Sequence, residues 1–183
     1  MKLDNYNNLL ELFFEQYKKQ DKNNIFLINL GNPKHKLSWE KTYLLVNHLS
    51  NQISKDIKLG DRCVLISENR PEWLISDLAI MLAGGISVPS YTTYTTKDYE
   101  YIIKDCEPSV LIVSNNTQFN KIKEILDYKK IKKIISFDRL ENLKFQNYLC
   151  IEDIINKKDG FENFDSEISL KRSDPACIIY TSG

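Results

Sequence analysis

The sequence has few of the residues that build redox centres, metal sites or membrane anchors. Its 183 residues include two histidines and four cysteines, and no Cys-x-x-Cys pair that would begin a zinc or redox site. Cys63 and Cys177 begin apolar runs, so we expect small buried side chains in a reduced protein. No apolar run is long enough to span a membrane, and no secretory signal follows Met1. The expected location is therefore the cytoplasm.

The sequence also has no net charge, since 25 Lys and Arg residues balance 25 Asp and Glu residues. Nucleic-acid-binding surfaces are usually strongly basic, so no nucleic-acid partner is expected. A hydrophobic content of 42% and a charged content of 27% are ordinary for a globular domain with one core. Six lysines are expected to form a solvated face: Lys121, Lys123, Lys129, Lys130, Lys132 and Lys133.

The spacing of apolar residues predicts alternating helices and strands. An apolar stripe from Tyr6 to Tyr17 has the spacing of an amphipathic helix. Ser38 is placed to cap a second helix, and Pro71 to begin a third that is apolar nearly all round. Thr96 is expected to cap a fourth. Strands are predicted at 25–30, 63–67, 86–89, 110–113 and 131–137, and further helices at 117–127 and 150–155.

This alternation predicts an α/β fold, layered, with a largely parallel sheet flanked by helices. In such sheets, ligands contact the carboxyl ends of the strands, where Ser67, Glu68 and Asn69 follow one predicted strand. Glu68 and Arg70 are expected to make local caps and ion pairs and not to catalyse. The pattern is weaker from 138 to 173, and residues 157–171 are expected to form a polar surface connection.

The last ten residues combine a turn, a short apolar strand and a loop of small residues. Asp174-Pro175 is followed by the apolar run 176–180 and then by Thr181, Ser182 and Gly183. Small hydroxyl residues and glycine allow backbone N–H groups to surround an anion, so these three residues are candidate phosphate-binding residues. Considered alone, they are better interpreted as an ordinary turn. We expect a natural domain to continue beyond such a strand, because nothing would cover its last residues.

Three stretches, taken in order, resemble the AMP-forming acyl-CoA synthetases of the adenylate-forming superfamily. They read GDRCVLISENRPEW from Gly60, AGGISVPSYTT from Ala83 and DPACIIYTSG from Asp174. The wording SENRPEW is most similar to the long-chain fatty acid–CoA ligases. The resemblance extends from about Leu37 to the last residue and is weakest from 138 to 173. The family often has proline after the tyrosine of V-P-x-Y, where this sequence has Thr92, which bears on subfamily assignment only.

The resemblance implies a ligase that activates a fatty acid, long-chain in the most similar subfamily. The carboxylate attacks the α-phosphorus of ATP to give an acyl-adenylate and pyrophosphate, and coenzyme A then displaces AMP. ATP, Mg²⁺ and coenzyme A are the implied cofactors, and peripheral membrane contact is compatible with such an enzyme. Thr181, Ser182 and Gly183 match the start of the family's phosphate loop. No catalytic residue and no metal ligand is assigned within this chain.

Residues 1–183 are accordingly expected to be part of the large amino-terminal AMP-binding domain, truncated within the active site and lacking the carboxyl-terminal domain. Such a piece is expected to be inactive by itself. Two alternatives stay open. An amino-acid or acyl-carrier adenylation domain would share this front half, whereas a non-catalytic interaction module would have a true stop codon after Gly183 and fold stably.

Overall fold

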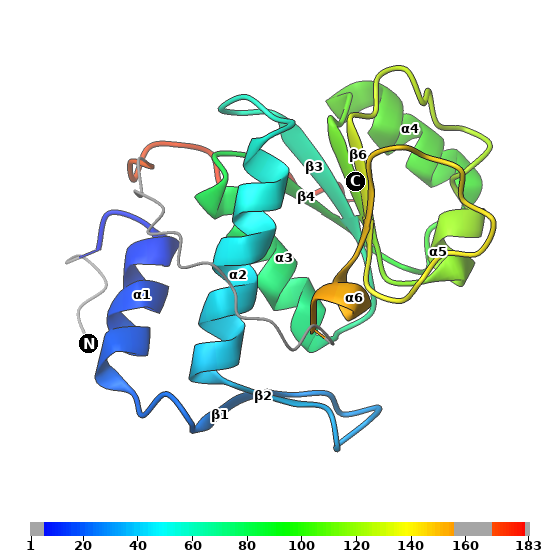
Figure 1. The fold of residues 1–183 in the computed structure, drawn as a ribbon. Helices are drawn as coiled ribbons and strands as arrows, with labels where there is room; N and C mark the ends of the chain where they lie inside the picture. The colour runs from blue at the N-terminus through cyan, green and yellow to red at the C-terminus, as the bar shows by residue number, and fades with distance from the viewer. Residues whose placement is uncertain (1–5, 156–169, 182–183) are drawn as a thin grey trace.

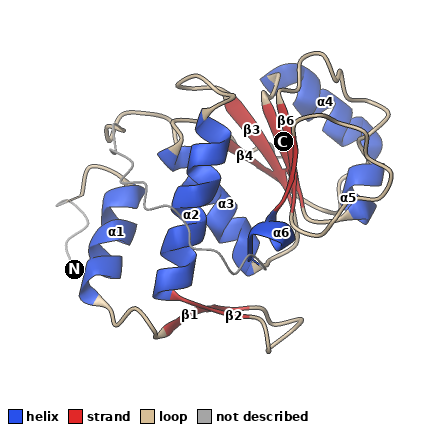
Figure 2. Ribbon diagram, viewed as in Figure 1, coloured by secondary structure: helices blue, strands red, loops and turns tan. Residues whose placement is uncertain are grey.

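The computed structural model describes residues 6–155 and 170–181 (Figure 1). Its centre is a five-stranded parallel sheet in the order β4-β3-β5-β6-β7, and a separate antiparallel pair, β1-β2, lies apart from it (Figure 2). The helices of the described part are α1 (Leu9–Lys19), α2 (Trp39–Ser54), α3 (Pro71–Leu82), α4 (Thr96–Cys106), α5 (Asn116–Asn120) and α6 (Ile151–Ile155). The strands are β1 (Ile25–Ile28), β2 (Lys36–Ser38), β3 (Arg62–Ile66), β4 (Ile86–Ser90), β5 (Val110–Val113), β6 (Lys133–Ser136) and β7 (Tyr148–Cys150).

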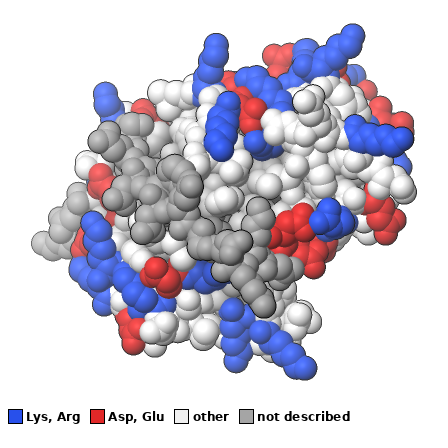
Figure 3. Space-filling view, viewed as in Figure 1, with Lys and Arg blue, Asp and Glu red and all other residues white. Residues whose placement is uncertain are grey.

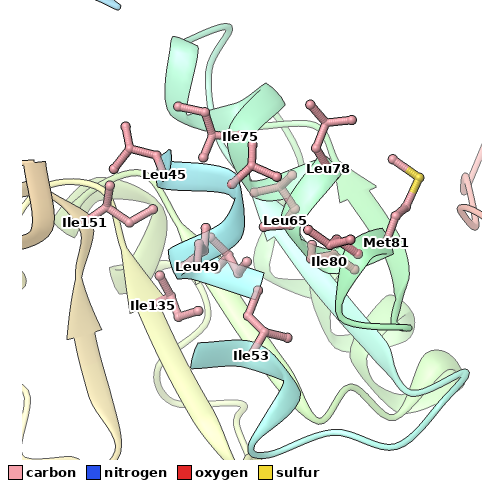
Figure 4. Close-up of a cluster of buried hydrophobic side chains, with 14 of the residues drawn as sticks. Leu45, Leu49, Ile53, Leu65, Ile75, Leu78, Ile80, Met81, Ile135 and Ile151 are labelled. Carbon is pink, nitrogen blue, oxygen red and sulfur yellow. The ribbon is translucent and has the colours of Figure 1, made fainter. Parts of the chain in front are cut away.

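Helices cover both faces of the parallel sheet, with α1, α2 and α3 on one face and α4 and α5 on the other (Figure 1). Successive side chains of a strand point to opposite faces, so each strand contributes to both layers. In β3, Leu65 packs with the first group of helices, and Val64 and Ile66 pack with the second. Figure 4 shows the first layer, where Leu49 and Ile80 lie close to Leu65. The predicted layered α/β fold is confirmed.

The chain reverses its direction of strand addition after β4. Strand β4 lies on one side of β3 and β5 on the other, and α3 and α4 make the two crossovers. Because such crossovers are right-handed, the reversal places α3 and α4 on opposite faces. The carboxyl ends of β3 and β5 therefore lie side by side at a topological switch point, which is where α/β sheets bind ligands.

Local signals placed most helix starts correctly. The Ser38 hydroxyl accepts a hydrogen bond in the first turn of α2, and Pro71 begins α3. The prediction that Thr96 caps α4 was wrong by one residue, because Thr95 is the cap. The Thr95 backbone N–H donates to the Asp98 carboxylate at 2.8 Å, and the Asp98 N–H donates back to the Thr95 hydroxyl. This reciprocal pair is a capping box, in which a side-chain acceptor three positions after the cap bonds back to the cap N–H.

Lys133 does not belong to the solvated lysine face. It is buried in β6, where its ammonium donates to the Gln52 carbonyl at 2.9 Å and lies 2.5 Å from the Asp56 carboxylate. Asn147 also donates to that carboxylate at 2.9 Å. A buried charge is tolerated when it is paired and hydrogen-bonded in this way. The prediction was therefore wrong for Lys133, because its partners are distant in the sequence.

Two other expectations need correction or fall outside the described residues, and one strand was not predicted. The helix predicted at 117–127 is shorter, since α5 ends at Asn120 and turns follow it. Strand β7 was not predicted, because its three residues are too few to show a period. The predicted surface connection at 157–171 lies almost wholly within 156–169, outside the described residues.

The terminal segment lies along the free edge of β4 as the start of a sixth parallel strand (Figure 1). The Ser87 N–H donates to the Ala176 carbonyl at 3.1 Å, and the Ile178 N–H donates to the Ser87 carbonyl at 2.9 Å. Cys177 is exposed, contrary to the expectation that it is buried, because it pairs with β4 on one side only. Ile179 is likewise 61% exposed.

We expect this edge to cause self-association that rises with protein concentration, because an exposed apolar edge pairs with other chains. Ile179→Lys should weaken the association, since a lysine on an edge opposes pairing. Sedimentation velocity over a concentration series measures the effect. Leu30→Lys is the matched control, because Leu30 is 90% exposed but lies in the β1–β2 connection. Equal effects of the two substitutions would contradict a role of the edge.

Candidate functional site

The candidate site lies at the carboxyl edge of the parallel sheet, where three segments meet. The terminal segment ends beside loop 91–95, which leads from β4 into α4, and the loop after β3 carries Glu68 nearby. The Tyr94 hydroxyl donates to the Tyr180 carbonyl at 3.1 Å. Tyr94 thus joins segments that are 86 positions apart in the chain.

The alternation of the terminal segment orients its last residues. Ile178 and Tyr180 pack against the core layer beneath α4. The residues that alternate with them, Cys177, Ile179 and Thr181, are exposed. Because strand side chains alternate, Thr181 is presented away from that layer. Thr181 is therefore exposed at the carboxyl edge, whereas Ser182 and Gly183 lie outside the described residues.

Two contacts hold the Tyr180 side chain against α4. Its hydroxyl donates to the Asp105 carboxylate at 2.6 Å, and its ring meets the edge of the Tyr101 ring with centroids 6.0 Å apart. Burial raises the pKa of Tyr180, and the bond to Asp105 raises it further. The hydroxyl therefore remains a donor at neutral pH.

Loop 91–95 is built around a buried tyrosine of α4. Tyr99 is fully buried, and its hydroxyl donates to the Tyr91 carbonyl at 2.7 Å. The Tyr94 ring contacts the rings of Tyr91 and Tyr99, with centroids 5.4 and 6.0 Å away. Burial, followed by the charge of Glu68, raises the pKa of Tyr99 to about 12. Tyr99 therefore anchors the loop as a permanent donor.

Polar groups gather at the switch point between β3 and β5. The Gln118 amide donates to one Glu68 carboxylate oxygen at 2.9 Å. Burial raises the pKa of Glu68, but Ser114, Gln118 and the charge of Arg70 outweigh burial and lower it. The second carboxylate oxygen and the Gln118 amide oxygen have no protein hydrogen-bond partner within residues 6–155 and 170–181. Both oxygens are buried. The sequence analysis did not identify Gln118 as a candidate. The one signal that could have pointed to it is its position shortly after an apolar strand.

Arg70 links the loop after β3 to the end of β6. Its guanidinium makes a two-pronged contact with the Asp138 carboxylate at 2.8 and 2.9 Å and lies 3.3 Å from Glu72. His35 Nδ1 lies 3.6 Å from the same Glu72 carboxylate. Arg70 and Glu72 line a cavity of about 380 Å³. The expected ion pairing of Arg70 is confirmed, although Asp138 is distant in the sequence and not a local partner.

Among residues 6–155 and 170–181, no three His, Cys, Asp or Glu side chains gather where they could hold a metal ion. In the same ranges, no helix has the length and apolar character needed to cross a bilayer. The charged side chains of the face in Figure 3 are mixed in sign, with Lys and Arg interspersed among Asp and Glu.

The family model of the AMP-binding enzymes matches residues 13–183. The chain belongs to the AMP-binding enzyme family. The resemblance found in three stretches of the sequence is thereby confirmed. The match includes the terminal segment that carries Tyr180 and Thr181.

Curated relatives of this AMP-binding chain are named long-chain-fatty-acid–CoA ligases. The chain is 27% identical to ACSBG1 of Rattus norvegicus over 186 aligned residues, which cover 99% of the chain and 24% of the relative. It is 27% identical to FadD15 of Mycobacterium tuberculosis over 140 residues, which cover 72% of the chain and 22% of the relative. The chain thus spans about a quarter of the length of the curated relatives that it matches.

Solved structures of other proteins share the fold of this chain. The coronafacic acid ligase of Pectobacterium brasiliense matches with a TM-score of 0.78 at 20% identity, covering 96% of this chain and 33% of the other. Apo MatB of Rhodopseudomonas palustris matches with a TM-score of 0.69 at 23% identity, covering 97% and 33%. At these identities the likeness concerns the fold of the AMP-binding domain.

Proposed function

We propose that residues 1–183 are part of the large amino-terminal AMP-binding domain of an ATP-dependent, AMP-forming acyl-CoA ligase. The observation that carries this proposal is the exposed Thr181, which follows the terminal strand at the carboxyl edge of a parallel sheet, within a segment matched by the family model. Carboxyl edges of parallel sheets are where α/β folds bind nucleotides. Thr181, Ser182 and Gly183 would begin the loop that holds the phosphates.

The substrate that we propose is a fatty acid, long-chain in kind, because the curated relatives carry that name. When bound, ATP supplies the α-phosphorus that the carboxylate attacks, and coenzyme A supplies the thiol that accepts the acyl group. Mg²⁺ would neutralise the phosphates, and no ligand for it is assigned here. The contribution of this chain is to position Thr181 and the backbone before it, since phosphoryl chemistry depends mostly on positioning and charge. The proposed location is the cytoplasm, and peripheral contact of the whole enzyme with a membrane is compatible with this location.

The decisive experiment reads the coding sequence beyond the Gly183 codon and expresses the whole open reading frame. We expect AMP, pyrophosphate and acyl-CoA to form in equal amounts from a long-chain fatty acid, ATP and coenzyme A. The 183-residue chain alone should form no acyl-adenylate. Turnover of amino acids, or transfer to a carrier protein in place of coenzyme A, would favour the related adenylation domains. A stop codon after Gly183, together with stable folding of the chain, would favour an interaction module.

Thr181→Ala in the whole enzyme should lower kcat/KM for ATP by about tenfold to a hundredfold, because a hydrogen bond to a charged phosphate is lost. Thr181→Ser keeps the hydroxyl and should retain most of the activity. Steady-state kinetics with varied ATP measure both variants. Equal losses in the two variants would show that the hydroxyl does not contact the phosphates.

A further inference from the structure

The peptide between Tyr180 and Thr181 is held by a side chain from another part of the chain. The Tyr94 hydroxyl donates to the Tyr180 carbonyl at 3.1 Å, and this is the carbonyl of the last residue before the candidate loop. A trans peptide is planar, so its carbonyl and the next N–H point in opposite directions. The bond from Tyr94 therefore also sets the direction of the Thr181 N–H, which is the first backbone donor of that loop.

Tyr94 is itself held in place on three sides. Its ring packs edge-on against Tyr91 and Tyr99, which are joined by the bond from the Tyr99 hydroxyl to the Tyr91 carbonyl. The next residue, Thr95, is the cap of α4 and is bonded to Asp98. On the preceding side, the Lys121 ammonium donates to the Thr92 carbonyl at 2.5 Å. A donor fixed in this way holds its acceptor in one direction, which a mobile side chain would not do.

A second contact fixes the other end of the same residue. The Tyr180 hydroxyl donates to Asp105 at 2.6 Å, near the end of α4. Tyr180 is thus bonded at its carbonyl by the residue that precedes the α4 cap and at its hydroxyl by the last turn of the helix. With both ends held, rotation of the peptide that leads into Thr181 would break a hydrogen bond.

From this geometry we propose that Tyr94 is a positioning residue for nucleotide binding, which orients the first phosphate-loop peptide through the Tyr180 carbonyl. Asp105 supports it by holding the Tyr180 side chain. This inference rests on the proposed function and assigns the affinity for the triphosphate partly to a residue that does not touch it. Preorganised donors bind anions more tightly because no ordering is needed on binding.

The test uses the protein expressed from the whole open reading frame. Tyr94→Phe keeps the ring and removes only the hydroxyl, and Tyr180→Phe removes the hydroxyl that donates to Asp105. Tyr128→Phe is the matched control, because the Tyr128 hydroxyl also donates to a backbone carbonyl, that of Lys123, at 3.0 Å. We expect Tyr94→Phe to raise KM for ATP about five- to tenfold with little change in kcat, which is the size of one lost hydrogen bond. Tyr180→Phe should raise KM less, and Tyr128→Phe should leave it unchanged.

Hydrogen–deuterium exchange supplies a readout that does not depend on turnover. Amides of the peptide that spans 176–181 should exchange faster in Tyr94→Phe than in Tyr128→Phe, while the amides of β3 and β5 stay protected. A merely structural role would lower kcat and melting temperature together and would not separate KM from kcat. An active wild-type enzyme whose KM is unchanged by Tyr94→Phe overturns this inference alone. A wild-type protein without ligase activity overturns the proposed function and this inference with it.

Discussion

Arg70→Ala should lower the free energy of unfolding by about 3–5 kcal/mol, because it removes one partner of a buried ion pair. The Glu72 side chain is only 3% exposed, and the Arg70 guanidinium lies 3.3 Å from it. Without Arg70, a buried carboxylate would have to be held without its main counter-charge. The same guanidinium contacts Asp138 at 2.8 Å, so the bond between the start of α3 and the end of β6 would be lost as well.

Urea denaturation followed by circular dichroism measures this effect, at low protein concentration so that association at the terminal edge stays small. Arg139→Ala is the matched control, because Arg139 and its partner Asp153 are 62% and 47% exposed. An exposed pair contributes less than about 1 kcal/mol. Arg70→Lys should recover only part of the loss, since an ammonium does not reproduce the two-pronged contact. Similar losses for Arg70→Ala and Arg139→Ala would contradict the importance of burial.

Helix starts, apolar strands and the α/β class could be predicted because each depends on neighbouring residues. Ser38 and Pro71 could be recognised as helix starts from the residues next to them, because a cap and a first-turn proline act within three or four positions. The error at Thr96 has the same origin. Two adjacent threonines are equivalent as caps until the position of Asp98 decides between them.

Pairings between distant segments could not be predicted. Nothing near Lys133 distinguishes it from the exposed Lys132, yet its neighbours in space are Gln52 and Asp56 at the end of α2. The bond between Arg70 and Asp138 likewise depends on β3 and β6 both ending at one edge of the sheet. Such contacts follow from strand order, which single-residue patterns do not encode.

The candidate site contains one residue that the sequence pattern indicated and one that it did not. Thr181 was indicated as a candidate from its place after an apolar run and from the resemblance of the surrounding stretch. Tyr94 was not, because a tyrosine in a polar loop has no distinguishing pattern until the terminal segment is seen beside it. Its proposed role depends on an edge pairing between Ser87 and Cys177, 90 positions apart, that only the folded chain reveals.

Tyr99→Ala should lower the free energy of unfolding by about 3–5 kcal/mol, as other large-to-small changes of buried aromatic residues do. Tyr99 is among the largest fully buried side chains, and it packs in the layer beneath α4. The substitution would leave a cavity and also leave the Tyr91 carbonyl without its donor. Tyr99→Phe removes only the hydroxyl and should cost about 1 kcal/mol, the typical net value of one hydrogen bond.

The difference between the two variants separates packing from loop anchoring. Tyr101→Ala is the control, because Tyr101 lies on the same helix but is 65% exposed, so its removal should cost about 1 kcal/mol or less. Urea denaturation gives the stability of each variant. Hydrogen exchange of loop 91–95 should be faster in Tyr99→Phe than in Tyr101→Ala, even where their stabilities are alike. If the loop stays equally protected in both, Tyr99 contributes packing alone, and the orientation of Tyr94 must depend on the α4 cap at Thr95 and on Lys121.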